Sequence, residues 1–264
     1  MYFLLAVVLL IIIYFYLIAP TFRKHPDREI FKNSFFAHRG LHSDFIPENS
    51  ISAFSKAVEK GYGIELDIHI TRDGEIVVFH DESLLRMCGV DQKVEELTLE
   101  ELKRYNLSNT DEKIPTFKDV LALVDGRVPL IIEFKSMKVN NDLLCETANE
   151  ILSNYNGKYC VESFNPFAVS WYKKHRKDIF RGQLAQNTKK KQFIAKISSA
   201  FFLNFLVRPD FIAFEEEYSN NLNFKIQKLF GAFCIGWTFE SQEEINKKKN
   251  EFSAFIFEKF NPKI

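Results

Sequence analysis

The chain has 264 residues, 46% of them hydrophobic and 27% charged, and its 35 basic side chains are balanced by 35 acidic ones. A neutral chain creates no overall field to attract DNA or RNA, and this one is too apolar to remain disordered. The composition therefore excludes a nucleic-acid partner and indicates a packed globular protein, of the length (about 250 residues) that one α/β barrel takes.

The first 19 residues contain no charged side chain. About 20 apolar residues let a helix span a bilayer, so we expect one transmembrane helix over residues 1–19. A cleaved signal peptide would need a basic start and a small-residue cleavage site, which this segment lacks. Because Arg23, Lys24 and Arg28 follow it, the positive-inside rule predicts a single-pass membrane protein with its catalytic domain on the cytoplasmic face. Residues 20–32 are the expected linker and residues 33–264 one barrel domain.

Short apolar runs rich in β-branched and aromatic residues predict nine strands. They cover residues 35–37, 64–70, 76–79, 130–134, 159–164, 180–185, 211–214, 233–239 and 254–257. Helical patterns lie between most of them, for instance at residues 49–60, 99–105, 116–124 and 240–249. Strands that alternate with helices predict a parallel sheet with right-handed crossovers.

One connection is too short for a helical crossover. Between residues 70 and 76 the chain carries Asp73-Gly74, a hairpin signal, so residues 76–79 should run antiparallel to the strand before them. The remaining eight strands are the number that closes a (β/α)8 barrel. Residues 87–96 and the helix after them then form a small insertion before the third barrel strand.

Acidic residues gather on two neighbouring strands of the predicted barrel. Side chains alternate along a strand with period two, so Glu65 and Asp67 lie on one face. Glu133 adds a third carboxylate on the next barrel strand. Neighbouring carboxylates repel each other and one would take up a proton, unless a cation lies between them. The pattern therefore predicts a divalent metal site with oxygen ligands.

Cations and imidazoles come to the same end of the barrel. The first strand is followed by His38 and Arg39, the hairpin returns His80 beside the carboxylates, and Lys135 follows the next strand. Alone, each of these residues is more often structural. Their conjunction at consecutive strand ends favours a site for phosphoryl chemistry, in which cations hold the phosphate charge and histidines move protons.

Several short motifs combine these residues. They are His38-Arg39-Gly40, Pro47-Glu48-Asn49-Ser50, Gly63-Ile-Glu65-Leu-Asp67, His80-Asp81 and Glu133-Phe-Lys135, with weaker matches that include Gly236-Trp237-Thr238. Together they resemble the glycerophosphodiester phosphodiesterase family, most strongly over residues 35–136 and more weakly over the rest of the barrel. The resemblance implies a TIM barrel that hydrolyses glycerophosphodiesters to glycerol 3-phosphate and an alcohol with Ca²⁺ or Mg²⁺.

The resemblance also implies a role for each matching residue. The acid–base pair would be His38 and His80, although which of them is the acid stays open. The metal ligands would be Glu65, Asp67 and Glu133, and the groups that stabilise the phosphate charge would be Arg39 and Lys135. The groups that support the metal or touch the substrate would be Glu48 and Asn49, and the wall of the substrate pocket would be Trp237.

Residues 189–207 leave a second substrate open. They begin with three lysines and continue with a Phe-rich apolar run, which fits either an outer barrel helix or a segment that rests on a lipid surface. In the second case lysophospholipids become better substrates than free glycerophosphocholine, as for a lysophospholipase D. A further alternative is a membrane-tethered phosphodiester-binding protein without catalysis, although no metal ligand or histidine is missing. A phospholipase C or sphingomyelinase D relative fits the three carboxylates less well.

Overall fold

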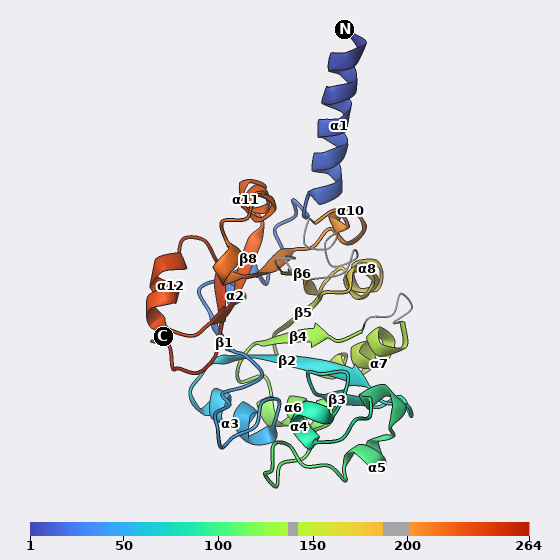
Figure 1. The fold of residues 1–264 in the computed structure, drawn as a ribbon, viewed down its shortest axis with the longest axis vertical. Coiled ribbons are helices and arrows are strands. Elements are labelled where there is room, and N and C mark those ends of the chain that lie inside the picture. The colour runs from blue at the N-terminus through green and yellow to red at the C-terminus, as the bar shows by residue number, and fades with distance from the viewer. Residues whose placement is uncertain (137–141, 187–200, 264) are drawn as a thin grey trace.

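The computed structural model describes residues 1–136, 142–186 and 201–263. Within these ranges, eight parallel strands close into a barrel through the pairing of β1 with β2 (Figure 1). A ninth strand, β3, pairs antiparallel with β2. The strands are β1 (Phe35–Ala37), β2 (Gly63–Ile70), β3 (Ile76–Val78), β4 (Leu130–Phe134), β5 (Tyr159–Ser163), β6 (Phe180–Ala185), β7 (Phe211–Glu215), β8 (Phe233–Phe239) and β9 (Ala254–Phe257). The predicted (β/α)8 barrel and its hairpin are confirmed.

Helices surround the barrel and bury one apolar face each. In α6, for example, Thr116 and Asp119 form a reciprocal capping box that starts the helix, and Phe117 and Val120 are buried toward the sheet. The outer helices are α3 (Ile51–Glu59), α6 (Phe117–Val124), α7 (Asp142–Leu152), α8 (Pro166–His175), α10 (Asn204–Val207), α11 (Leu222–Leu229) and α12 (Gln242–Lys248).

Large aromatic side chains fill the inside of the barrel. Phe36, Phe180, Phe211 and Phe233 belong to one buried cluster, which accounts for part of the high phenylalanine content. A Cβ at Gly182 would lie 2.0 Å from the Phe211 ring, so only glycine lets this ring pack against β6. Packed aromatic layers close the middle of the barrel and leave its ends for a site.

The segment between β3 and α6 forms the predicted insertion. It holds α4 (Leu85–Cys88), a 3₁₀ turn (Val94–Glu96) and α5 (Leu99–Leu102). Leu84, Val94 and Leu102 bury themselves with Phe79 in a small cluster separate from the barrel core. The insertion therefore has its own packing and can hold a side chain against the neighbouring barrel end.

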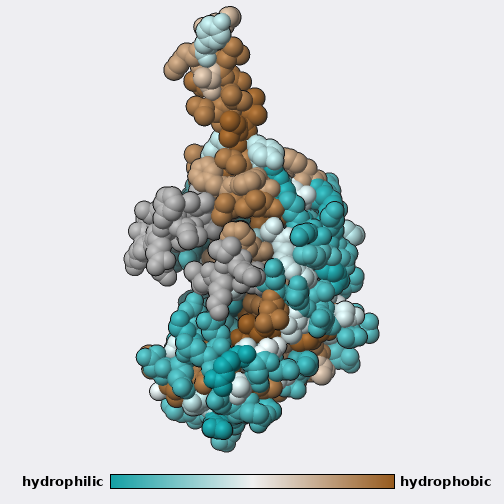
Figure 2. Space-filling model, turned by 90° about the vertical axis from the view of Figure 1, so that its right-hand side faces the viewer, coloured by the Kyte–Doolittle hydropathy of each residue, from teal (hydrophilic) through white to brown (hydrophobic). Residues whose placement is uncertain are grey.

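The first helix, α1 (Tyr2–Ile18), projects from the barrel beside α10 and α11, and its apolar side chains stand clear of the domain (Figures 1 and 2). It has 17 residues and ends at Ile18, because Pro20 disfavours the helical conformation of the residue before it, Ala19. Its length is about 25 Å at the usual rise per residue, less than the hydrocarbon core of about 30 Å.

The last turn of α1 is held by the barrel. Ile18 is buried, and its carbonyl accepts hydrogen bonds from Asn204 Nδ2 at 2.8 Å and Gln227 Nε2 at 3.0 Å. Among residues 1–136, 142–186 and 201–263, no helix combines the length and apolarity needed to cross a bilayer. The predicted transmembrane helix, and with it the single-pass protein whose catalytic domain faces the cytoplasm, is wrong.

Two further segments had been predicted as a linker (residues 20–32) and as either an outer barrel helix or a segment on a lipid surface (residues 189–207). Residues 189–200 of the lysine- and Phe-rich segment fall outside the described ranges, and its last part, α10, contacts α1 and α8 with Val207 buried. In the predicted linker, α2 (Arg28–Phe31) places Phe31 in the aromatic cluster inside the barrel, 5.7 Å from Phe36 between ring centres.

Candidate active site

Three carboxylates meet at the carboxyl ends of β2 and β4. Asp67 is in register with Glu133, and the nearest oxygens of Glu65, Asp67 and Glu133 all lie within 4.8 Å of one another. All three are buried. Burial, then the charges of Asp67 and Glu133, raises the pKa of Glu65 well above its usual value, and burial raises that of Glu133 to about 7. Hard oxygen donors that repel each other fit a divalent cation such as Ca²⁺ or Mg²⁺.

Two cations border this acidic triad. Lys135 Nζ lies 3.0 Å from Asp67 Oδ1 and 2.8 Å from Glu133 Oε1. Arg39 has a φ of 55°, and its backbone N–H donates to Glu65 Oε2 at 3.0 Å while its Nε lies 3.5 Å from Asp67 Oδ2. Burial alone would raise the pKa of Asp67, but Lys135 and Arg39 hold it well below its usual range. The centre therefore combines positive and negative charge.

His38 follows β1 and is oriented by a carboxylate beyond β9. Its Nδ1 lies 2.7 Å from Glu258 Oε2, and hydrogen bonds from His38 and His42 hold the pKa of Glu258 well below its usual range. An ionised carboxylate only accepts hydrogen bonds, so Nδ1 carries the hydrogen and Nε2 of the neutral ring is an acceptor. Burial lowers the pKa of His38, which favours this neutral form.

His80 follows β3 and has a similar arrangement. Its Nδ1 donates to Asp81 Oδ1 at 2.6 Å, and Asp81 in turn accepts from Arg86 Nε at 2.6 Å. Burial lowers the pKa of His80 to about 4, against the nearby charge of Asp67. The backbone carbonyl of His80 accepts from His69 Nε2 at 3.2 Å, so His69 supports the loop from the buried face of β2.

Glu48 and Asn49 support the charged centre in different ways. Asn49 Nδ2 donates to Asp67 Oδ2 at 2.8 Å. Glu48 Oε1 accepts from Arg39 Nη1 at 2.8 Å and from Arg86 Nη2 at 2.6 Å. Arg86 lies on α4, so the insertion is tied through Glu48 to Arg39 and through Asp81 to His80.

Trp237, on β8, is the one predicted site residue whose described contacts are aromatic. Its ring meets that of Phe164 edge to face at 5.9 Å, and both pack against the cluster inside the barrel. The structure thus brings nine of the ten predicted residues into one charged network and leaves Trp237 on an adjoining wall.

Sequence reasoning missed Glu258 and Arg86. Glu258 directly follows β9, so the strand-end rule that selected Glu133 and its neighbours applies to it as well. Arg86 lies in the insertion, where no strand pattern or spacing marked it.

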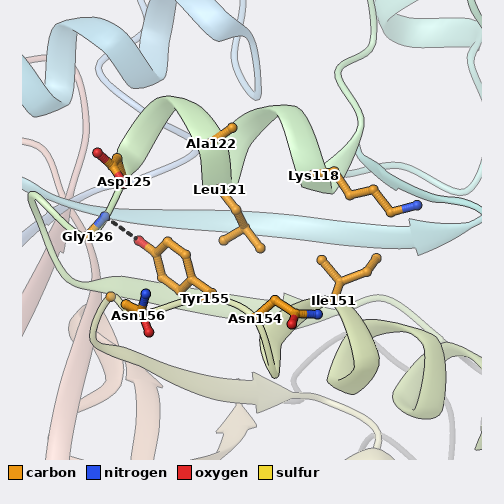
Figure 3. Close-up of a pocket in the computed structure, with 10 residues that line it drawn as sticks. Lys118, Leu121, Ala122, Asp125, Gly126, Ile151, Asn154, Tyr155 and Asn156 are labelled. Atoms are coloured by element: carbon orange, nitrogen blue, oxygen red, sulfur yellow. Dashed lines mark hydrogen bonds between the residues drawn. The ribbon is translucent and has the colours of Figure 1, made fainter.

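Two surface hollows do not contain the acidic triad. One of about 460 Å³ is bordered by the ends of α6 and α7, where the Gly126 N–H donates to Tyr155 Oη at 3.2 Å (Figure 3). Gly126 precedes β4, so this hollow lies at the amino end of the barrel, opposite the carboxylates. Another, of about 640 Å³, lies within the insertion near Tyr105. The acidic triad lines neither hollow, so neither is the candidate active site.

A barrel whose strand ends carry three carboxylates, two cations and two oriented histidines defines a hydrolase of phosphate esters. The model of the glycerophosphoryl diester phosphodiesterase family matches residues 38–251, and the chain belongs to this family. It is therefore a phosphoric diester hydrolase that acts on glycerophosphodiesters.

Individual relatives agree with this assignment. A glycerophosphodiester phosphodiesterase of Caldanaerobacter subterraneus is 35% identical over 165 residues, which are 59% of this chain and 68% of that protein. Human lysophospholipase D GDPD1 is 31% identical over 153 residues, 53% of this chain and 47% of the human protein.

Solved structures show the same barrel. A glycerophosphodiester phosphodiesterase of Thermotoga maritima has a TM-score of 0.68 and 25% identity, with 85% of this chain and 94% of that one covered. An Oleispira antarctica phosphodiesterase, solved with the product sn-glycerol-3-phosphate, has a TM-score of 0.73 over 88% of this chain and 94% of that one. At 20% identity the second likeness shows the fold alone.

Proposed function

We propose that the protein hydrolyses glycerophosphodiesters to glycerol 3-phosphate and an alcohol by metal-dependent acid–base catalysis at the carboxyl end of the barrel. The observation that carries this proposal is the pair His38 and His80. Each ring gives its Nδ1 hydrogen to a carboxylate, and each lies beside the acidic triad.

Glu65, Asp67 and Glu133 would hold the cation, Ca²⁺ or Mg²⁺. When bound, a divalent cation supplies Lewis-acid polarisation of the phosphate group. The protein itself supplies the remaining charge, because Arg39 and Lys135 stand beside the triad and can pair with the other phosphate oxygens.

The two histidines transfer protons through Nε2. One neutral ring accepts the proton of the attacking middle hydroxyl of the glycerol moiety, and the other, once protonated, delivers a proton to the oxygen of the departing alcohol. Water then opens the resulting cyclic phosphate to glycerol 3-phosphate, and the two rings exchange their roles as acid and base. Because Glu258 and Asp81 fix the Nδ1 hydrogens, neither ring needs to change tautomer before it accepts a proton.

The test is product release by the purified protein from glycerophosphocholine, with EDTA, Mg²⁺ and Ca²⁺ in parallel. We expect glycerol 3-phosphate and choline in equal amounts with a metal, and none with EDTA. Activity that persists in EDTA contradicts the metal dependence. The absence of product with every metal contradicts the proposed substrate.

A second candidate is hydrolysis of lysophospholipids, favoured by the human relative named lysophospholipase D. The same bond is cleaved in lysophosphatidylcholine, but the phosphate product keeps its acyl chain and appears as lysophosphatidic acid with choline. The same assay with this lipid therefore separates the two candidates by product identity, and a ratio of kcat/KM that favours the lipid selects the second.

A further inference from the structure

Glu162 is a buried carboxyl group inside the barrel that the proposed mechanism does not use. It lies on β5, two residues after Cys160, whose side chain belongs to the cluster inside the barrel. Alternation along the strand therefore turns Glu162 inward as well. In register it stands beside Glu133 on β4 and Gly182 on β6, and it is 2% exposed.

Glu162 Oε2 has no hydrogen-bond partner among the described residues. A buried polar atom without a hydrogen-bond partner is unfavourable, so such atoms normally have a protein or ligand partner. Glu162 does not belong to the triad, whose oxygens meet within 4.8 Å. The Phe211 ring over Gly182 offers it no polar contact. Its partner is therefore expected from the substrate.

Next to Glu162, toward the carboxyl end of the barrel, lies a hydrogen-bond donor that has no partner within the described ranges. Phe164 follows on the same inward face, and its ring meets Trp237, whose buried Nε1 has no acceptor in the described part of the chain. One wall of the pocket thus offers an acceptor and a donor. A hydroxyl group, which both donates and accepts, is the chemical complement of this pair.

We propose that Glu162 is a specificity-determining residue that binds the free primary hydroxyl of the glycerol moiety, with the indole N–H of Trp237 as the second contact. The inference rests on the proposed function, because the proposed function places the phosphate of the substrate at the triad. Neighbouring strands lie about 4.8 Å apart, which matches the few bonds between a glycerol phosphate and its far hydroxyl. An acyl chain on that hydroxyl removes its hydrogen, so the subsite selects glycerophosphodiesters over lysophospholipids.

The experiment compares two diesters that differ by this hydroxyl: glycerophosphocholine and the phosphocholine diester of propane-1,2-diol, which keeps the middle hydroxyl. For the unmodified protein we expect kcat/KM to be about 10–100-fold higher with glycerophosphocholine, the factor that corresponds to one or two hydrogen bonds. In Glu162→Leu this ratio should fall about 10-fold, to what the Trp237 contact alone supplies, mainly because KM for glycerophosphocholine rises.

Further variants separate recognition from structure. Glu162→Gln keeps an acceptor oxygen and should retain part of the ratio, and Trp237→Phe, which keeps an aromatic ring, should lose part of it. Glu150→Leu makes the same chemical change on an exposed face of α7 and should leave the ratio unchanged. If Glu162→Leu lowers kcat/KM for both diesters by the same factor, Glu162 is structural and the inference is wrong.

Calorimetry gives a readout that does not depend on turnover. sn-Glycerol 3-phosphate and propane-1,2-diol phosphate differ by the same hydroxyl, and we expect only the first to lose about 10-fold or more in affinity in Glu162→Leu. If the unmodified protein hydrolyses neither diester, the proposed function fails. The calorimetric difference still decides the role of Glu162, and equal affinities of the two compounds for the unmodified protein overturn the inference.

Discussion

Nδ1 of His38 lies 2.7 Å from Oε2 of Glu258, although 220 residues separate them in the sequence. The closure of the barrel between β1 and β9 creates this contact, since each residue directly follows one of the two paired strands. Glu258 therefore holds the His38 ring and stabilises its protonated form once it has accepted a proton.

Replacement of Glu258 tests this positioning role. In Glu258→Gln we expect kcat to fall about 10–100-fold, because the ring loses its anionic partner. The carboxylate raises the pKa of His38, so its loss should lower that pKa further and move the limb of the kcat/KM profile that His38 governs, the acid limb if it is the base and the alkaline limb if it is the acid, to lower pH. Glu240→Gln is the matched control, since Glu240 contacts Lys259 beside Glu258 but not the histidine. An unchanged pH profile would contradict the assignment.

Replacement of the histidines tests the proton transfers directly. His38→Ala and His80→Ala should each lower kcat by roughly 10²–10⁴, the usual contribution of a general acid or base. Calorimetric affinity for Mg²⁺ or Ca²⁺ should stay within a few-fold of the original value, because neither ring is a triad carboxylate. His175→Ala on α8 serves as the control. Wild-type rates in both variants would show that the two rings are not the acid–base pair.

The sequence was sufficient to predict the barrel because each strand is a short, strongly β-forming run. Predicted and observed bounds coincide for β1, β4, β6, β8 and β9. The Asp73-Gly74 turn separated β3 from the barrel strands, as the antiparallel pairing confirms. The acidic triad could be predicted from the sequence as well, because period two along β2 and parallel pairing with β4 fix the relative positions of its members.

Other features depend on contacts that no local pattern encodes. A count of apolar residues predicted a membrane span, but it could not show that α1 ends at Ile18 with its carbonyl bound by Asn204 and Gln227. Arg86 reaches Glu48 only because the insertion folds over the barrel end. Glu162 was visible as a polar residue in a strand, but its missing partner appears only once its neighbours are in place.

Metal binding should depend on pH through the triad. With no cation bound, burial holds the pKa of Glu133 at about 7, so this group is mostly protonated at pH 6 and mostly ionised at pH 8. A metal must displace that proton at the lower pH, and we expect the affinity for Ca²⁺ or Mg²⁺ to rise roughly tenfold between pH 6 and pH 8. Isothermal titration at both pH values measures this change.

Two variants complete the metal experiment. Glu133→Gln should weaken binding at both pH values and reduce the change between them, because one titrating ligand is gone. Glu150→Gln, on the exposed side of α7, should behave as the unmodified protein. An affinity in the unmodified protein that stays constant from pH 6 to pH 8 would refute the assignment of Glu133 as a ligand that takes up a proton.

Arg86 should influence catalysis without touching the phosphate. Its guanidinium donates to Asp81 Oδ2 and to both oxygens of Glu48, so it orients the partner of His80 and the partner of Arg39 at once. Lysine carries the charge but lacks the planar set of donors, so Arg86→Lys should lower kcat about 10-fold and change KM little.

The matched control for this variant is Arg104→Lys, an exposed arginine of the same insertion. If Arg86→Lys lowers kcat no more than Arg104→Lys does, the insertion only packs beside the site. If kcat falls selectively while the thermal unfolding midpoint and the metal affinity stay constant, the insertion holds His80 and Arg39 in their working orientation, because a loss of folding or of metal would have changed those two measurements as well.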